Sequence, residues 1–154
     1  MTPIITTDPA RIDLDAVHAF LSQQAHWSRG IPRRTVQRAI SNSLCFAALE
    51  HHGPGAPLAG FARVVTDRAT FAYLCDVFVL PAGRGRGIAR ALLAAIDAHA
   101  DLQGLRRVVL FTRDAHGLYA RHGFAPLTNP ERGMERLHAG LYTRANDFPQ
   151  GPAA

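Results

Sequence analysis

Three glycines and three arginines stand together in the stretch GRGRGIAR (83–90), directly before a run rich in alanine and leucine. Glycine lets a backbone turn closely, whereas alanine and leucine favour a helix. The first N–H groups of a helix have no partner within it and carry the positive end of the helix dipole. The stretch therefore predicts an anion site at a helix start. A glycine-rich turn without a ligand is the alternative.

Two common phosphate-binding motifs do not fit this loop. A Walker A loop needs a Gly-Lys-Ser/Thr sequence, and all 17 basic residues of this chain are arginines. A dinucleotide fingerprint needs a third glycine where Arg90 stands, and it normally opens a strand–helix–strand unit at the start of a domain. If the loop binds an anion, it therefore belongs to another kind of anion-binding motif.

A second chemically notable residue is Asp76, which interrupts FAYLCDVFVLP (71–81), the most hydrophobic strand expected in the chain. An ionised carboxylate is rarely placed in such a strand without a partner or a task. Asp76 is therefore a candidate general base. The alternative is a structural carboxylate that caps backbone amides or pairs with an arginine such as Arg113.

The hydrophobic pattern places these residues in a mixed α/β fold, with a mostly antiparallel central sheet flanked by helices. The short turns within 44–81 predict antiparallel hairpins, and the strand–helix–strand from 71 to 112 predicts one parallel crossover. The expected order is β-α-α-β-β-β-α-β-α-β. Strands are expected at 3–6, 44–50, 58–67, 71–81, 106–112 and 134–141, and helices within 8–24 and at 33–42, 88–100 and 114–121.

Composition favours an ordinary globular domain at residues 1–145, followed by a flexible tail at 146–154. Neither a signal-peptide pattern nor a membrane-length apolar run is present, and two cysteines without CxxC spacing indicate reduced thiols in the cytoplasm. The net charge of +5 permits an anionic partner, but the arginines are dispersed, so a nucleic-acid partner is not expected. The histidines predict no metal site, since His51 and His52 are adjacent.

RGRGIA (84–89) resembles the Arg/Gln-x-x-Gly-x-Gly/Ala signature of the GNAT N-acetyltransferase superfamily. Two flanking segments, DVFVLP (76–81) and DAHGLYARHGF (114–124), are also similar to segments of that family, and the resemblance covers about residues 4–127. It implies a coenzyme A pyrophosphate on the main chain of the loop and a pantetheine arm along the preceding strand. The implied cofactor residues are Val77, Phe78, Val79, Arg84, Gly85, Arg86, Gly87, Ile88, Ala89 and Arg90.

The same resemblance implies roles for residues outside the loop. Tyr119 matches the tyrosine that contacts coenzyme A and protonates its sulfur, although it could instead only pack its helix onto the sheet. YLCDVFV (73–79) is similar to YLEDFFV of polyamine acetyltransferases, but Cys75 replaces the proposed base, which leaves Asp76 or a water ordered by it. Thr112 replaces a common asparagine and could offer its hydroxyl to the pantetheine.

The acceptor pocket of such a fold is built from the loop between the first two helices, here residues 25–34. Trp27 could hold a flat or anionic acceptor beside Arg29, or it could close the core over the first helix, and the core position is preferred. Tyr73 and Asp76 complete the expected acceptor residues.

The resemblance implies an acetyl-CoA-dependent N-acetyltransferase without a metal, which acetylates a primary amine of a small molecule, peptide or protein by direct attack in a ternary complex. Acetylation of aminoacyl-tRNA and a non-catalytic acyl-CoA sensor are the alternatives. A free edge strand would allow a homodimer.

Overall fold

The computed structural model describes residues 2–144, which build a single five-stranded sheet. Its strands lie in the order β1-β2-β3-β4-β5, and neighbouring strands are antiparallel except β4 and β5, which are parallel. The predicted mixed, mostly antiparallel sheet is thus confirmed. The strands are β1 (Ile4–Thr6), β2 (Leu44–Leu49), β3 (Leu58–Thr66), β4 (Phe71–Val79) and β5 (Arg107–Val109).

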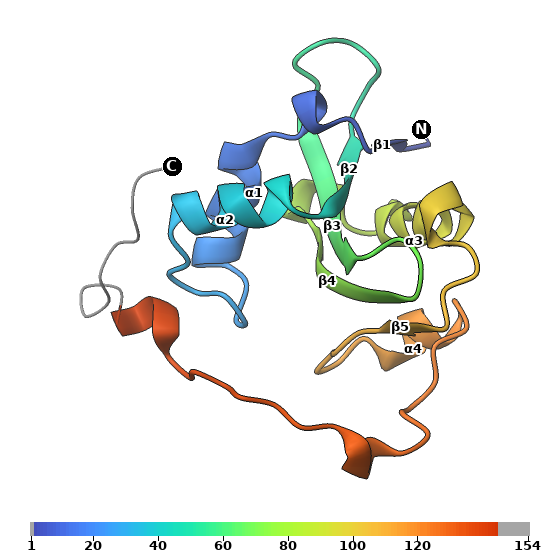
Figure 1. The fold of residues 1–154 in the computed structure, drawn as a ribbon. Coiled ribbons are helices and arrows are strands. Elements are labelled where there is room, and N and C mark those ends of the chain that lie inside the picture. Colours follow the sequence, from blue (N-terminus) through green and yellow to red (C-terminus); the bar gives the residue numbers. More distant parts are fainter. Residues whose placement is uncertain (1, 145–154) are drawn as a thin grey trace.

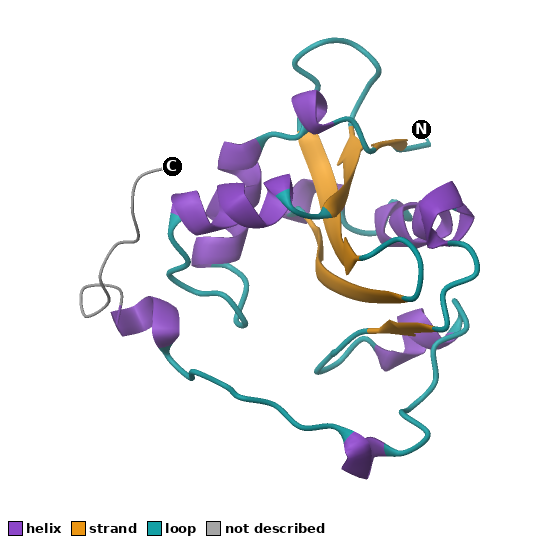
Figure 2. Ribbon diagram, viewed as in Figure 1, coloured by secondary structure: helices purple, strands orange, loops and turns teal. Residues whose placement is uncertain are grey.

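Helices cover both faces of the sheet (Figure 1, Figure 2). Two helices on one face and a third on the other each enclose a hydrophobic core against the strands. A short fourth helix follows β5 and packs against the second core. The helices are α1 (Leu14–Gln23), α2 (Arg33–Ser41), α3 (Ile88–Ala98) and α4 (His116–Ala120), and 3-10 turns lie at η1 (Pro9–Arg11), η2 (Pro81–Gly83), η3 (Ala100–Leu102), η4 (Pro130–Arg132) and η5 (Leu141–Arg144).

The two-sided burial explains why the central strands lack an alternating pattern. All six residues of β2 are buried. Cys45, Ala47 and Leu49 face the core under α1 and α2, whereas Leu44, Phe46 and Ala48 face the core under α3. A strand with helices on both faces is apolar at every position, as the sequence LCFAAL is.

Local signals fix the ends of several helices. The Asp13 carboxylate accepts a hydrogen bond from the Ala16 N–H at 3.0 Å and so caps α1, while Asp8 caps η1. Helix α1 thus starts within the range 8–24 that the sequence predicts, and aspartate is a favoured N-cap residue. The predicted hairpin between β3 and β4 is likewise present, and the Asp67 carboxylate accepts bonds from the N–H groups of Ala69, Thr70 and Phe71. The bond that the Thr70 hydroxyl donates to the same carboxylate, together with these N–H bonds, lowers the pKa of Asp67.

A bulge interrupts β4 in its middle. Phe61 pairs with Phe78 and Arg63 pairs with Cys75, so β4 has one more residue than β3 across this interval. The bulge lies at Asp76, whose φ is +50°. This backbone conformation costs energy for any residue but glycine. Because of the bulge, Cys75 and Phe78 face the same side of the sheet although they are three residues apart.

Three sequence predictions about elements are wrong. Residues 134–141 form no strand, because within residues 2–144 no strand lies beside them and all of them are exposed. The strand expected at 106–112 is limited to Arg107–Val109, which pair with residues 71–73 of β4. The last helix is shorter than predicted and ends before Gly123, whose φ is +82°. The tail predicted at 146–154 lies outside the described residues.

No helix within residues 2–144 has the length and apolar character needed to cross a membrane.

A close packing contact beneath residues 83–90, called here the arginine-glycine loop, gives a stability prediction. A Cβ on Gly60 would lie 2.8 Å from Ile88 Cγ2 and 3.0 Å from the Phe78 carbonyl oxygen. Gly60→Ala should therefore lower the free energy of unfolding by about 1–3 kcal/mol through overpacking. Urea denaturation measures the change. The control is Gly117→Ala on α4, where nothing lies within 4 Å, and it should be neutral or slightly stabilising. Equal effects of the two changes would contradict the packing argument.

Candidate functional site

The sheet opens between its two parallel strands. β5 pairs only with residues 71–73 of β4, whereas β4 continues to Val79. Along residues 74–79, β4 therefore has no strand beside it on that edge in the described chain (Figure 1). Backbone N–H and C=O groups along such an edge can bind an extended ligand. The predicted residues Val77, Phe78 and Val79 all lie on this edge.

The arginine-glycine loop carries the chain from β4 to α3. The Leu80 N–H donates to the Ala59 carbonyl at 2.9 Å, which ties the start of the loop to β3. Gly85 and Gly87 have φ values of +75° and +76°, and the space where a Cβ would stand is open at both. The glycines thus leave the main chain accessible.

Gly87 is the N-cap of α3 and supplies no side-chain cap. The first backbone bond of the helix runs from the Ala91 N–H to the Gly87 carbonyl at 3.0 Å. In the part of the chain that the structure describes, the N–H groups of Ile88, Ala89 and Arg90 donate to no protein acceptor. Unpaired N–H groups at a helix start bind anions, and a pyrophosphate carries the required charge.

The side chains of the predicted loop residues have different surroundings. Arg84 and Arg90 are exposed. Arg86 is paired with Glu50, and its two terminal nitrogens lie 3.0 Å from the two carboxylate oxygens. This bond fastens the loop to the end of β2 and lowers the pKa of Glu50. Ile88 and Phe78 are buried, so these two residues can offer a ligand only their main chain.

A broad depression of about 480 Å³ adjoins the start of α3. It is open to solvent and lies over the first turns of the helix, next to the N-terminal residues. Arg86 and Arg90 give it positive charge. Its lining residues are Thr2, Pro3, Arg86, Gly87, Arg90, Ala91 and Ala94.

Tyr119 lies on α4 and packs against the α3-side core, as do Val77 and Val79. Its ring meets Phe124 edge to face with the centroids 5.9 Å apart. Burial raises the pKa of the phenol above its ordinary value. The hydroxyl therefore keeps its proton at neutral pH. Thr112 lies just before α4, where its hydroxyl oxygen accepts a bond from the Ala115 N–H at 3.0 Å.

Asp76 is the centre of a hydrogen-bonded network on the opposite face of the sheet. One carboxylate oxygen accepts a bond from Trp27 Nε1 at 2.9 Å, and the other accepts from Arg63 Nε at 2.7 Å. Arg63 also donates to the Ser43 hydroxyl at 3.1 Å. Only 11% of the Asp76 side chain and 18% of the Arg63 side chain are exposed. The arginine that pairs with Asp76 is thus Arg63, and the suggestion of Arg113 was wrong.

Trp27 is 47% exposed, so the preference for a core position was wrong. Its indole N–H joins the helix-connecting loop to the bulge of β4. Tyr73 lies on β4 and meets the exposed Phe111 edge to face, with centroids 6.0 Å apart. Arg29 is exposed in the same loop as Trp27. Three of the predicted acceptor residues therefore lie on or beside the bulge, and the fourth stands on the loop that contacts it.

Cys45 and Cys75 flank Arg63 on neighbouring strands, because both residues pair with it across the sheet. They are free thiols, and burial raises the pKa of each to about 12. Both remain protonated and weakly nucleophilic at neutral pH.

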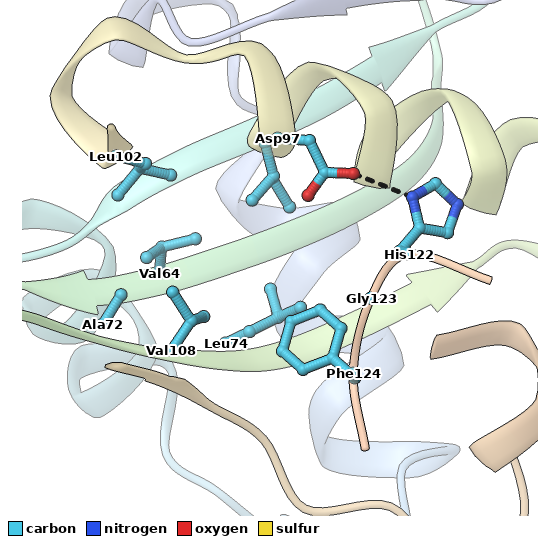
Figure 3. Close-up of a pocket in the computed structure, with 10 residues that line it drawn as sticks. Val64, Ala72, Leu74, Asp97, Leu102, Val108, His122, Gly123 and Phe124 are labelled. Carbon is cyan, nitrogen blue, oxygen red and sulfur yellow. Dashed lines mark hydrogen bonds and ion pairs between the residues drawn. The ribbon is translucent and has the colours of Figure 1, made fainter. Parts of the chain in front are cut away.

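A separate apolar pocket of about 220 Å³ lies under the end of α3 (Figure 3). Val64, Leu74, Val108 and Phe124 line it, and an Asp97–His122 contact of 2.9 Å stands at its side. None of the predicted site residues lines this pocket. Residues 2–144 also contain no group of three or more histidine, cysteine or acidic side chains that could hold a metal ion.

The sequence profile of the Acetyltransferase (GNAT) family matches residues 14–124. The chain therefore belongs to the GNAT acetyltransferase family, and its class is that of a transferase.

Individual relatives agree with this assignment. A crystal structure of a GNAT-family protein from Xanthomonas campestris is 51% identical, covers 93% of this chain and 98% of that one, and superposes with a TM-score of 0.87. A protein of Gibberella zeae named as an acetyltransferase is 34% identical, in an alignment that covers 77% of this chain and 76% of that protein. Glucosamine-6-phosphate N-acetyltransferase of Arabidopsis thaliana is 13% identical with a TM-score of 0.62, covers 90% and 99% of the two chains, and shares the fold alone.

Sequence reasoning missed Arg63 as a site residue. Arg63 interrupts the apolar strand LAGFARVVT much as Asp76 interrupts the next strand, so two opposite charges in adjacent apolar strands were the available signal. It also missed the contact of Glu50 with Arg86, for which the spacing of 36 residues gives no signal.

Because the Arg63–Asp76 pair is mostly buried, removing one of its two charges should lower the stability of the fold. Asp76→Asn should lower the free energy of unfolding by about 3 kcal/mol, since it leaves a buried guanidinium unpaired. Asp76→Ala should cost a further ~1 kcal/mol, because alanine tolerates a positive φ less well than asparagine. Chemical denaturation of both variants measures these differences.

Two controls accompany this test. The exposed pair Asp15–Arg33 has side chains that are 78% and 50% exposed, and Asp15→Asn should change stability by less than about 1 kcal/mol. Combining Arg63→Met with Asp76→Asn should recover part of the lost stability, because no buried charge is then unpaired. A double variant no more stable than Asp76→Asn would show that the ion pair is not the cause.

Proposed function

We propose that this protein is an acetyl-CoA-dependent N-acetyltransferase that acetylates a primary amine of a small molecule or peptide by direct attack in a ternary complex. The observation that carries the proposal is the opening between β4 and β5, which ends at the unpaired N–H groups of α3. An extended chain with a charged pyrophosphate at one end matches this combination of a free strand edge and an anion cradle.

The residues present fit coenzyme A. The main chain of residues 77–79 would hold the pantetheine amides, and the N–H groups of residues 84–90 would hold the pyrophosphate. Arg84 and Arg90 are exposed beside this cradle and add positive charge, while Arg86 keeps the loop in place through Glu50. When bound, acetyl-CoA supplies an activated acetyl group as a thioester.

Tyr119 is the proposed general acid. Its side chain packs on the same core as Val77 and Val79, which places α4 at the side of the opening. Its raised pKa keeps a proton on the hydroxyl oxygen, available for a departing thiolate. The Thr112 hydroxyl oxygen accepts a hydrogen bond from the Ala115 N–H, so its observed contact is with the residue just before α4.

The acceptor amine is proposed to approach from the face that carries Asp76 and Trp27. Because each Asp76 oxygen already accepts one bond, we assign the removal of the amine proton to a water held by Asp76. Tyr73 and Phe111 provide an aromatic wall on the same face, and Arg29 provides a positive charge at the loop. Two free thiols agree with a reducing compartment such as the cytoplasm.

The acid role gives a test by substitution. Tyr119→Phe should lower turnover by about 10²-fold or more, because a positioned proton donor contributes that much, and should leave coenzyme A affinity nearly unchanged. Thiol release from acetyl-CoA, measured across primary amines, amino acids, peptides and aminoacyl-tRNA, reports turnover. Calorimetry reports binding. Tyr142→Phe removes a hydroxyl from a tyrosine that packs on the other core and is the matched control.

Each outcome of this test separates the candidate functions. Absence of coenzyme A binding would overturn the whole proposal, and binding without turnover on any acceptor would indicate a sensor. Turnover only with aminoacyl-tRNA would show that the acceptor is aminoacyl-tRNA and not a small molecule or peptide. Full activity of Tyr119→Phe would contradict the proposed role of Tyr119 as general acid and leave the rest of the proposal intact.

The raised pKa of Tyr119 also sets a pH dependence. The protonated phenol is the active form, so activity that needs it is present below its pKa and is lost as the pH rises through it. Because burial raises that pKa above 10.0, turnover with saturating acceptor should show no alkaline decline below about pH 10. Measuring turnover against pH tests this, and Tyr119→Phe should abolish the alkaline decline. A decline near pH 8 that disappears in Tyr119→Phe would contradict the raised pKa, and a decline above pH 10 that persists in Tyr119→Phe would contradict the acid role.

A further inference from the structure

Helix α4, which carries Tyr119, is only five residues long and has no side-chain cap at its N-terminus. So short a helix is not stable by itself, since isolated helices of fewer than about 12 residues are marginal in water. It must therefore be held by contacts with the rest of the fold. Leu118 and Tyr119 supply some of these contacts, because both pack against the α3-side core.

A side-chain bond also joins this segment to α3. His122, in the turn that follows α4, has its Nδ1 atom 2.9 Å from a carboxylate oxygen of Asp97 (Figure 3). Since an ionised carboxylate can only accept, the ring nitrogen donates. The His122 side chain is only 14% exposed, and that of Asp97 is 50% exposed. Within residues 2–144, this is the only hydrogen bond or ion pair by which a side chain joins residues 111–124 to another part of the fold.

Packing beside this bond is incomplete. The apolar pocket of about 220 Å³ lies there, and its lining includes Ile96 and Asp97 of α3 and residues 122–124 after α4. A void leaves the side chains around it without partner atoms and so without their dispersion attraction. Apolar packing therefore holds residues 122–124 against α3 less firmly than a filled core would, and more depends on the His122–Asp97 bond.

The turn that contains His122 is bonded directly to Tyr119. The N–H groups of His122 and Phe124 donate to the Tyr119 carbonyl at 2.9 Å and 3.2 Å. The Phe124 ring also meets the Tyr119 ring edge to face. A displacement of this turn would therefore displace Tyr119, through both the main chain and the rings.

We propose that His122 is a positioning residue, which through its bond to Asp97 holds the Tyr119 hydroxyl at the side of the opening between β4 and β5. Neither His122 nor Asp97 is among the residues assigned above to the cofactor, the acid or the acceptor. The effect on turnover rests on the proposed function, because it requires Tyr119 to be the general acid. A catalytic group that is misplaced by about 1 Å can lower a rate by about 10²-fold.

The position of Tyr119 can be tested without turnover, by an NMR titration of the full chain with tyrosine labelled at ¹³Cζ. In the parent, burial raises the pKa of the Tyr119 phenol. His122→Ala should lower this pKa toward the ordinary value of about 10, because the released turn lets water reach the ring. Burial also raises the pKa of Tyr73, which should stay unchanged and is the internal control. An unchanged titration of Tyr119 would overturn the proposal.

Turnover gives a second test. His122→Ala should lower kcat by about tenfold or more and leave the KM for acetyl-CoA nearly unchanged, because only the reacting step needs the placed hydroxyl. His122→Asn keeps an N–H donor close to the place of Nδ1 and should restore most of the rate. The control His116→Ala removes the same ring from an exposed position of α4 and should leave kcat nearly unchanged.

Asp97→Ala breaks the same bond from α3, at a half-exposed side chain, and replaces His122→Ala if that variant fails to fold. Its effect on kcat should equal that of His122→Ala, and the double variant should be no slower than either single variant, because all three lack one shared bond. In a Tyr119→Phe background, His122→Ala should cause little further loss, since the hydroxyl that it positions is already absent.

The outcomes separate this inference from the proposed function. Full activity of Tyr119→Phe would contradict the acid role, and the titration would still decide whether His122 holds Tyr119. If Tyr119→Phe is impaired while His122→Ala and Asp97→Ala keep the parent kcat, the positioning role is overturned and the proposed function stands. A loss from His122→Ala as large in the Tyr119→Phe background as in the parent would also overturn the positioning role.

Discussion

The bulge at Asp76 is the feature on which the site depends. An extra residue in β4 at this point requires a positive φ, and the cost of that conformation is offset by bonds from Trp27 and Arg63 to the two carboxylate oxygens. β5 pairs with β4 only before the bulge. Within residues 2–144 no strand lies beside β4 after the bulge, so the strand edge there is open. A buried ion pair thus stabilises the strained residue at the point where the sheet opens.

The helix start is placed by a second constraint, the close contact between Ile88 and two glycines. Side chains on Gly60 or Gly83 would lie 2.8 Å or 2.7 Å from atoms of Ile88. Since Ile88 is the first residue of α3, its burial against these glycines sets the position of the unpaired N–H groups beside the end of β4. Gly85 and Gly87 have another purpose, because they leave the main chain open to solvent. The glycines of this region therefore act in two ways, through close packing and through backbone conformation.

The sequence was sufficient to predict the elements whose signals are local. Helix α1 lies within 8–24, a short turn joins β3 to β4, and the glycine-rich loop leads into α3, as expected. The strand expected at 134–141 failed because a strand needs a neighbour, and apolar residues such as Met134 and Leu137 do not identify one. The pairing of Asp76 with Arg63 and the exposure of Trp27 also depend on tertiary contacts. The register of β3 and β4 decides the ion pair, for which two opposite charges in adjacent apolar strands were the available signal, and the position of the loop between α1 and α2 decides the exposure of Trp27.

The two faces of the opening differ in chemistry, and this difference bears on how a transfer could occur there. Tyr119 packs on the α3 side with Val77 and Val79, where burial keeps the phenol protonated. Asp76, Trp27 and Arg63 form a charged and hydrogen-bonded group on the α1 side. In the proposed reaction, the phenol on one face would protonate the leaving group, and the carboxylate on the other face would act on the incoming amine. Both thiols near Asp76 stay protonated, so the arrangement favours direct transfer to the amine over an acyl-cysteine intermediate.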